Sequence, residues 1–331
     1  MASRVVVSVA MEFRGRSVAR EIFEAAGIEV IARPGSAGWP DDETREKMRH
    51  VDAILAGAER LNASTLNGAD RLRIIARNGV GYDRVDLEYC TQRGIVVSNT
   101  PGAMADAVAD HAMALLLAAV RHIVPGDRAV KDGRYEVAIG EDLASMTLGL
   151  VGCGHIGAET ARRALGFKMR VLVCDPWAET SRIEALGASL VSLDELLAES
   201  HVVSLHLPLS DENTGMVDAD FLSRMQSGSF LINTARGGLV DEPALIEALQ
   251  SGHLTAAGLD CQDSEPPQGV SLDLVRLPNV VAMPHSASKT LTARENMSRV
   301  AARTIVDCLL GREPEFVVNR DVLARLDLEP R

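Results

Sequence analysis

The chain has 331 residues, of which 47% are hydrophobic, 3% aromatic and 24% charged, and its formal net charge is −12. This length is sufficient for two domains with separate cores, and the low aromatic content predicts cores of Ala, Val and Leu. The negative charge argues against nucleic acid or an anionic membrane as a general partner. The five cysteines are scattered, without a CxxC pair or a Cys/His cluster, so we expect buried thiols and no metal site.

No segment has the pattern of a targeting or membrane-spanning sequence. The N-terminus carries too few consecutive apolar residues for a secretory signal. The most apolar helical stretch, 103–120, contains Asp106, Asp110 and His111, so it is not predicted to cross a membrane. We therefore expect a cytoplasmic protein.

Short β-branched runs alternate with amphipathic stretches, which is typical of parallel sheets covered by helices. The first series of predicted strands is 5–9, 29–32, 53–56, 74–76 and 95–98, with helices such as 16–26 and 84–93 between them. The second series is 147–151, 170–174, 201–206, 229–233, 256–259 and 280–282. An amphipathic helix, 291–310, and an apolar tail around Phe316 follow the last strand.

The second series opens with a dinucleotide-binding fingerprint, LGLVGCGHIG at 148–157. Gly152 permits a tight turn, Gly154 lets a pyrophosphate approach the backbone, and Gly157 lets the following helix pack on the strand. The next stretch, 158–167, has helical composition, so its N-terminal amides would face the phosphates. Asp175 closes the next strand, where its carboxylate can bind the ribose hydroxyls. The second series is therefore predicted to be the nucleotide-binding half.

The helix 291–310 is expected to return to the first series of strands. The first domain would then be discontinuous, residues 1–99 with 288–331, and the nucleotide-binding domain would be 100–287. The pattern predicts an α/β protein of two Rossmann-like or flavodoxin-like domains. Each has a doubly wound parallel sheet, and a cleft lies between the domains.

Three polar side chains follow strands of the second series, at the edge where open α/β sheets bind ligands. Arg236 could hold a carboxylate and polarise a carbonyl, His285 could donate a proton, and Glu265 could orient the imidazole and favour its charge. Each alone is more often a loop charge or a turn residue. Three of them at strand ends beside a nucleotide site favour hydride transfer to a 2-oxo acid.

With these motifs the chain resembles the D-isomer-specific 2-hydroxyacid dehydrogenases over residues 72–316. The resemblance rests on RNGVGYD at 77–83, NTPG at 99–102, the fingerprint, HLPL at 206–209, NTARG at 233–237, GLD at 258–260, EPP at 265–267 and PH at 284–285. It implies NAD as the cofactor, a small 2-oxo or 2-hydroxy acid as the substrate, and a cytoplasmic homodimer joined through the NAD-binding domains, near the helix 103–120.

The resemblance also implies roles for individual residues. The catalytic triad is Arg236, Glu265 and His285, and the backbone amides of Gly79, Val80 and Gly81 bind the substrate carboxylate together with Arg236 and His285. Asp260 would hold the nicotinamide carboxamide. The implied cofactor-binding residues are Gly152, Gly154, His155, Ile156, Gly157, Asp175, Leu207, Pro208, Thr214, Thr234, Ala235, Arg236, Asp260, His285 and Ala287.

Departures from subfamily patterns bear on the substrate. Formate dehydrogenases of this kind have Gln where this chain has Glu265 and Asn where it has Met104, and phosphite dehydrogenases have Lys in place of Val80. Many phosphoglycerate dehydrogenases carry an Arg at the end of the third strand, which is absent from 53–58 although Arg60 lies nearby. The chain also stops short of a C-terminal regulatory domain. These features favour glyoxylate or hydroxypyruvate over a phosphorylated acid.

Two alternatives stay open. One is a D-3-phosphoglycerate dehydrogenase. The other is a non-catalytic, NAD-sensing protein like the corepressors named C-terminal binding proteins, which share the fold and the catalytic residues. The complete catalytic set favours an enzyme, with NAD preferred over NADP because Asp175 would repel a 2′-phosphate.

Overall fold

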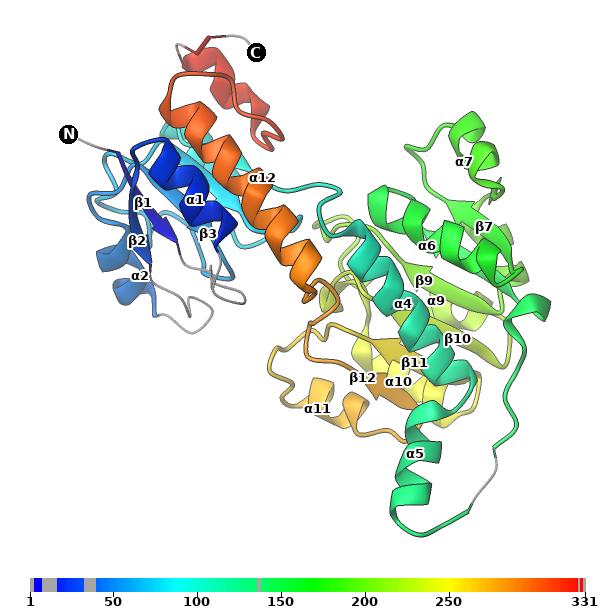
Figure 1. Cartoon of the computed structure of the whole chain (residues 1–331). Helices are drawn as coiled ribbons and strands as arrows, with labels where there is room; N and C mark the ends of the chain where they lie inside the picture. Colours follow the sequence, from blue (N-terminus) through cyan, green and yellow to red (C-terminus); the bar gives the residue numbers. More distant parts are fainter. Residues whose placement is uncertain (1–2, 8–16, 33–39, 136–137, 327, 330–331) are drawn as a thin grey trace. The chain divides into compact units, whose positions relative to one another are not determined.

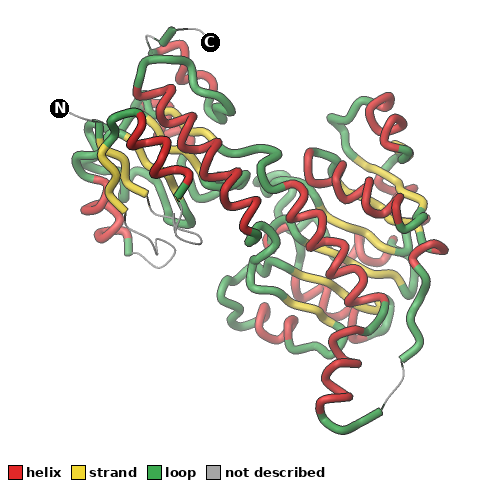
Figure 2. The backbone as a smooth tube through the Cα atoms, viewed as in Figure 1, coloured by secondary structure: helices red, strands yellow, loops and turns green. Residues whose placement is uncertain are grey.

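The computed structural model describes residues 3–7, 17–32, 40–135, 138–326 and 328–329. The chain forms two compact units (Figures 1 and 2). Unit 1 comprises Met1–Met104 and Thr290–Arg331, and unit 2 comprises Ala105–Lys289. Every strand pairing in both units is parallel and helices cover the sheets, so the prediction of two α/β domains with parallel sheets is confirmed.

Unit 1 is built on a five-stranded sheet of order β2-β1-β3-β4-β5. Its strands are β1 Arg4–Val7, β2 Glu29–Ala32, β3 Ala53–Ala56, β4 Ile74–Arg77 and β5 Val96–Ser98. Its helices are α1 Val18–Ala25, α2 Asp41–Met48, α3 Leu87–Gln92 and α12 Leu291–Leu309, with a 3-10 turn, η4, at Arg320–Arg325. The central strand β3 is an apolar run that is buried throughout, and β4 is apolar and buried up to its last residue, Arg77, as expected for a parallel sheet with helices on both faces.

Helix α12 completes the core of unit 1 from the far end of the chain. Its buried residues Ala301, Ala302 and Ile305 pack with Phe23 of α1 and Leu55 of β3. Small residues at these positions let the helix lie close to α1 and the sheet. The two pieces of unit 1 are therefore held together by a shared hydrophobic core.

Unit 2 is built on a seven-stranded sheet of order β12-β11-β10-β9-β6-β7-β8. Its strands are β6 Thr147–Val151, β7 Arg170–Cys174, β8 Ser189–Leu190, β9 Val202–Leu205, β10 Ser229–Asn233, β11 Leu254–Leu259 and β12 Val280–Ala282. Its helices are α4 Ala105–Val120, α5 Ile123–Lys131, α6 His155–Gly166, α7 Thr180–Leu186, α8 Leu193–Glu199, α9 Ala219–Arg224, α10 Glu242–Gln250 and α11 Val270–Val275. The 3-10 turns η2 Leu143–Ser145 and η3 Gly237–Leu239 complete it.

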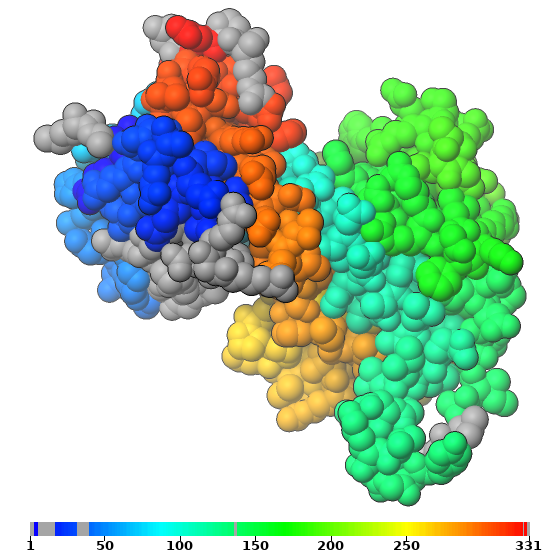
Figure 3. Space-filling model, in the orientation of Figure 1, coloured from blue at the N-terminus to red at the C-terminus, as the bar shows by residue number. Residues whose placement is uncertain are grey.

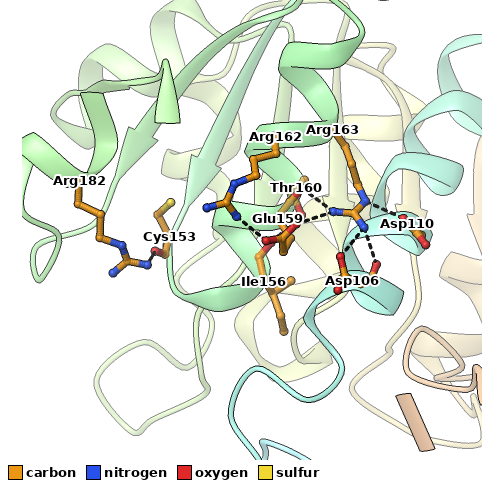
Figure 4. Close-up of polar contacts among 9 residues, drawn as sticks. All are labelled: Asp106, Asp110, Cys153, Ile156, Glu159, Thr160, Arg162, Arg163 and Arg182. Atoms are coloured by element: carbon orange, nitrogen blue, oxygen red, sulfur yellow. Dashed lines mark hydrogen bonds and ion pairs between the residues drawn. The ribbon is translucent and has the colours of Figure 1, made fainter. Parts of the chain in front are cut away.

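Helix α4 packs tightly on the sheet of unit 2. A Cβ at Gly258 of β11 would lie 2.9 Å from Cβ of Leu115, so only glycine permits this approach. Arg163 of α6 holds the exposed side of α4, with its nitrogens 2.9 Å from Asp106 and 2.6 Å from Asp110 (Figure 4). The same guanidinium lies 2.9 Å from Glu159 of its own helix. Contacts on two sides therefore fix the position of α4.

The predicted elements differ from the observed ones mainly at their ends. Helix α6 begins at His155, three residues before the predicted start, because a glycine-rich first turn looks like a loop in composition. The short edge strand β8 was not predicted, and β11 begins at Leu254. Parts of the predicted strand 5–9 and helix 16–26 lie outside the described residues.

Within the described residues, no single helix has the length and apolar character needed to cross a membrane. Only α4 and α5 taken together reach that composition, and they meet at a bend of 62°. In the same part of the chain, no three His, Cys, Asp or Glu residues are grouped so that they could hold a metal ion.

Candidate active site

The fingerprint joins β6 to α6 in unit 2. Gly152 has a φ of +89°, and a Cβ there would lie 2.6 Å from the carbonyl oxygen of His206. A Cβ at Gly157 would lie 2.5 Å from the carbonyl oxygen of Gly152. A Cβ at Gly154, by contrast, would meet no described atom within 4 Å apart from its chain neighbours and the backbone of its own helix. Gly154 is also the N-cap of α6, whose first-turn amides lack helical acceptors. The loop therefore has the open backbone and the exposed amides that a pyrophosphate requires.

Asp175 follows β7 and is tied to this loop. Its Oδ2 accepts a hydrogen bond from the amide of Cys153 at 2.8 Å, and its Oδ1 accepts one from the amide of Trp177 at 2.9 Å. Arg182 of α7 donates to the carbonyl of Cys153 at 3.1 Å (Figure 4). The Asp175 carboxylate therefore binds the amide of Cys153, and the Arg182 guanidinium binds the carbonyl of the same residue. Sequence reasoning missed Arg182 because it lies seven residues beyond Asp175, on a separate helix.

The predicted triad lies on three neighbouring strands of the sheet. Arg236 follows β10, Glu265 lies in the loop after β11, and His285 follows β12, all beyond the carboxyl ends of parallel strands. Nδ1 of His285 lies 2.8 Å from Oε2 and 2.9 Å from Oε1 of Glu265. Because an ionised carboxylate only accepts hydrogen bonds, Nδ1 is the donor and Nε2 is left to exchange a proton. The structure therefore brings Glu265 and His285 into direct contact.

Arg236 is held by its own loop. Its Nη1 donates to the carbonyl of Ala235 at 2.7 Å. Asn233 braces the backbone, accepting from the amide of Ala235 at 2.9 Å and donating to the carbonyl of Arg236 at 2.8 Å. A Cβ at Gly237 would lie 2.0 Å from the backbone of Gln262, so this loop packs directly against the one after β11.

The buried thiol of Cys261 shows which charges gather here. Burial raises its pKa, the charges of Glu265 and Asp260 raise it further, and Arg236 opposes them. The three side chains therefore act electrostatically on one point between their loops.

Asp260 follows β11, and its side chain is buried. Its carboxylate accepts from the amides of Ser286 and Ala287, at 2.8 and 2.9 Å. Sequence reasoning gave it a contact with the nicotinamide carboxamide and did not foresee these backbone partners. Its other neighbour, His111 of α4, was noted only as a polar interruption of an apolar helix.

The remaining predicted cofactor residues also follow strands of unit 2. Leu207 and Pro208 lie two and three residues after the end of β9, and the hydroxyl of Thr214, farther along the same loop, donates to the carbonyl of Ser210 at 2.8 Å. The hydroxyl of Thr234 is buried and has no hydrogen-bond partner among the described residues. A buried hydroxyl without a partner beside the fingerprint edge fits a ligand that completes its bonding.

In unit 1, the loop Gly79–Val80–Gly81 follows β4. Its three carbonyls are all engaged: Gly79 accepts from the amide of Thr100 at 3.1 Å, Val80 from Nδ2 of Asn99 at 2.9 Å, and Gly81 from Nε of Arg77 at 3.0 Å. Among the described residues, the amides of these three residues have no acceptor. With the carbonyls tied back, the loop presents donors only, as an anion-binding backbone requires.

Arg77 is a further residue that sequence reasoning missed. Its guanidinium also hydrogen-bonds the carbonyl of Gly57 after β3, so it links two loops at one end of the sheet. In the sequence, Arg77 stands out only as the first residue of the motif at 77–83. Its position as the last residue of β4, pointing into a loop, was the available signal.

Comparison with known proteins identifies the family of the chain. Residues 113–287 match the family model described as D-isomer specific 2-hydroxyacid dehydrogenase, NAD binding domain. A glyoxylate reductase from Pyrococcus furiosus is 38% identical over 333 residues, covering 98% of this chain and 97% of that protein.

Two further proteins are similar to the chain. A D-3-phosphoglycerate dehydrogenase from Archaeoglobus fulgidus is 37% identical over 92% of this chain, which spans 57% of the length of that protein. The crystal structure of a protein from Thermus thermophilus superposes with a TM-score of 0.85 at 39% identity, covering 95% of this chain and 99% of the other. The resemblance drawn from the motifs is confirmed, and the chain belongs to the D-isomer-specific 2-hydroxyacid dehydrogenase family and carries its NAD binding domain.

Proposed function

We propose that the protein transfers a hydride between NAD(H) and a small D-2-hydroxy acid or 2-oxo acid such as glyoxylate or hydroxypyruvate. The observation that carries the proposal is the His285–Glu265 pair, with Nδ1 bound at 2.8 Å and Nε2 left for a proton. Reduction of a ketone needs both a hydride and a proton. A histidine held by a carboxylate beside a dinucleotide fingerprint fits the second requirement.

His285 acts as general acid in reduction and as general base in oxidation. Glu265 holds the N–H at Nδ1 and so orients the ring, and Nε2 carries the proton that the developing alkoxide takes. Arg236 binds the carboxylate and polarises the 2-oxo group through its planar fork. In unit 1, the amides of the Gly79–Gly81 loop supply further donors for the carboxylate.

NAD fits the residues at the fingerprint and supplies the hydride when it is bound. Gly152, Gly154 and the first turn of α6, including His155 and Ile156, would hold its pyrophosphate, and Asp175 the adenosine ribose. Thr234, Ala235 and Ala287 would lie along its nicotinamide end. We expect NADH to be preferred over NADPH because the Asp175 carboxylate would repel a 2′-phosphate.

The substrate is proposed from two sources. The Pyrococcus furiosus relative, similar over nearly its whole length, is named a glyoxylate reductase. The Archaeoglobus fulgidus relative favours D-3-phosphoglycerate as the alternative, and the exposed Arg60 after β3 is the side chain that could meet a phosphate.

We also propose a cytoplasmic homodimer. All five cysteines are free thiols, as a reducing compartment allows. Helix α5 and the residues after it, named here the α5 arm (residues 123–135 and 138–140), extend from the end of α4 away from the sheet of unit 2 (Figures 1 and 3). The arm exposes Val130 at 60% and both Tyr135 and Ile139 at 91%. Such a run of large apolar groups is typical of a surface that a second copy covers.

Steady-state oxidation of NADH and NADPH with a panel of acids tests the proposal. The panel holds glyoxylate, hydroxypyruvate, pyruvate and 3-phosphohydroxypyruvate. We expect glyoxylate or hydroxypyruvate to give the highest kcat/KM, with NADH above NADPH. A preference for the phosphorylated acid that Arg60→Ala abolishes would establish the alternative. Absence of turnover with every acid, despite binding of NADH, would contradict the enzymatic proposal.

A further inference from the structure

One residue binds the whole backbone turn that carries His285. The amide of His285 donates to the main-chain oxygen of Asp260 at 2.8 Å. The next two amides, of Ser286 and Ala287, donate to its Oδ1 and Oδ2 at 2.8 and 2.9 Å. His285 itself has a φ of +50°, a left-handed conformation that a residue with a side chain adopts only when its surroundings impose it. Asp260 is therefore what holds His285 in this conformation.

The carboxylate of Asp260 has to stay charged while it is buried. It is 1% exposed, and burial by itself raises its pKa. His111 and the amides of Ser286 and Ala287 outweigh burial, so the pKa lies below the ordinary value for an aspartate. The hydroxyl of Ser286 makes a longer contact with Oδ1 of Asp260, at 3.5 Å. Two amides, this hydroxyl and the imidazole of His111 therefore surround the anion.

His111 approaches the carboxylate from α4. Its Nε2 is buried and lies 3.2 Å from Oδ1 of Asp260. No described residue accepts a well-aligned hydrogen bond from this nitrogen, so its approach to Asp260 is a close polar contact without ideal hydrogen-bond geometry. Because Arg163 and the Leu115–Gly258 contact fix α4, the imidazole is carried on a rigid support.

We propose that His111 is a positioning residue: by stabilising and orienting the Asp260 carboxylate, it fixes the turn 285–287 and with it the direction of the His285 imidazole. The inference rests on the proposed function, since His285 is the proton donor there. Without His111, the carboxylate would be buried with fewer partners and would protonate or rotate toward water. Either change loosens the amides that it holds, and His285 loses its orientation while the fingerprint is untouched.

The test compares three variants with the wild type. His111→Leu removes the polar group, and His111→Gln restores a side-chain N–H. The control is His253→Gln, because His253 precedes β11 at the opposite end of the strand that leads to Asp260, and its Nε2 contacts the carbonyl of Leu222 at 2.9 Å. Hydrogen exchange of a peptide covering 283–289 is followed without cofactor, and kcat and KM are then measured with NADH and the best acid of the panel.

For His111→Leu we expect exchange of the 283–289 peptide to be faster by about tenfold and kcat to fall about tenfold, with KM for NADH within about threefold of wild type. His111→Gln should recover part of both effects. His253→Gln should leave the exchange rate of the 283–289 peptide and kcat at their wild-type values, even if the melting temperature of this variant differs from that of the wild type.

Unchanged exchange and unchanged kcat in His111→Leu would overturn the inference. Faster exchange across all of unit 2 would also overturn it, because His111 would then be a general stabilising residue. A wild type without turnover in which His111→Leu still accelerates exchange of 283–289 would support the positioning role and refute the proposed function, so the two failures are distinguishable.

Discussion

His285 combines an accessible imidazole with a constrained backbone. Its side chain is 46% exposed, which lets it meet a ligand, while Glu265 holds Nδ1 and Asp260 holds its amide. The direction in which Nε2 points is therefore set before any substrate arrives. Such preorganisation is what makes proton transfer from a side chain efficient.

Replacing His285 or its partner tests this arrangement. We expect His285→Ala to lower kcat by about 10²-fold or more, the range found for a positioned proton donor. Glu265→Gln should also lower kcat for reduction, because an amide binds the N–H at Nδ1 more weakly than a carboxylate does and leaves the imidazole less well oriented. The measurement is the steady-state kcat for reduction. A His285→Ala enzyme with near-native kcat would show that another group donates the proton.

His206 predicts a pH dependence of stability. Burial lowers its pKa from 6.5 to about 4, and its Nε2 lies 2.9 Å from the hydroxyl of Ser204. The unfolded chain therefore binds a proton at this histidine at a higher pH than the folded chain, so stability falls as the pH is lowered from about 6.5 to about 4. The full shift corresponds to about 3 kcal/mol at most.

We expect His206→Gln, which keeps a polar group beside Ser204 but does not titrate, to flatten this decline. Melting temperatures of the cofactor-free protein at pH 7 and pH 4.5 provide the measurement. The difference between the two pH values should be larger for wild type than for the variant. Equal differences would mean that His206 does not contribute to acid destabilisation.

At the scale of elements, the loop after β4 is held in place by its carbonyls. Arg77, Asn99 and the amide of Thr100 each bind one of these carbonyls, so the conformation of the loop depends on residues outside it. If the amides of the loop bind the substrate carboxylate as proposed, they can do so only while these anchors hold. Arg77 bears most on this because it also binds the loop after β3.

Arg77→Met should therefore raise KM for the oxo acid by about tenfold or more, since a loop that reorients loses its charge-binding amides. NADH affinity, measured by fluorescence titration, should change less than about twofold because the fingerprint lies in unit 2. Arg84→Met is the matched control, because Arg84 donates only to the carbonyl of Ala58 and is exposed. An unchanged KM in Arg77→Met would show that the loop keeps its shape without this anchor.

The sequence was most informative where a pattern repeats or a motif is local. The buried strands could be predicted because their apolar runs are unbroken, and the fingerprint because its glycines answer local steric demands. Arg236, Glu265 and His285 could be proposed because parallel strands end at one edge. The catalytic roles of these three residues stay predictions, whereas the contact between Glu265 and His285 is observed in the structure.

The residues that were missed act either across a long separation in the sequence or on backbone atoms. His111 precedes Asp260 by about 150 residues, and only the packing of α4 on β11 brings them together. Arg182 and Arg77 donate to backbone carbonyls. Every residue has a carbonyl, so the residue type of the acceptor gives no signal in the sequence. A single sequence shows which side chains could do chemistry, but not which ones hold the backbone that carries them.

At the scale of the whole molecule, the α5 arm predicts association. Its exposed Val130, Tyr135 and Ile139 would be costly to leave in water. The double variant Ile123→Glu with Val130→Glu should therefore shift the protein from dimer to monomer in analytical ultracentrifugation. Leu310→Glu is the control, since Leu310 is 57% exposed but lies at the end of α12 in unit 1. A wild type that sediments as a monomer, or a double variant that stays dimeric, would contradict this interface.

The discontinuity of unit 1 has a consequence for synthesis on the ribosome. Unit 2 is one continuous stretch, Ala105–Lys289, and can close its core as soon as that stretch has emerged. The core of unit 1 needs Ala301, Ala302 and Ile305 of α12, which are translated after the whole of unit 2. The strands of unit 1 therefore wait, with one face of their sheet uncovered, until α12 has emerged behind unit 2. Unit 1 completes its core after unit 2, although most of its strands are made before it, and its uncovered sheet is a part of the nascent protein that chaperones can protect.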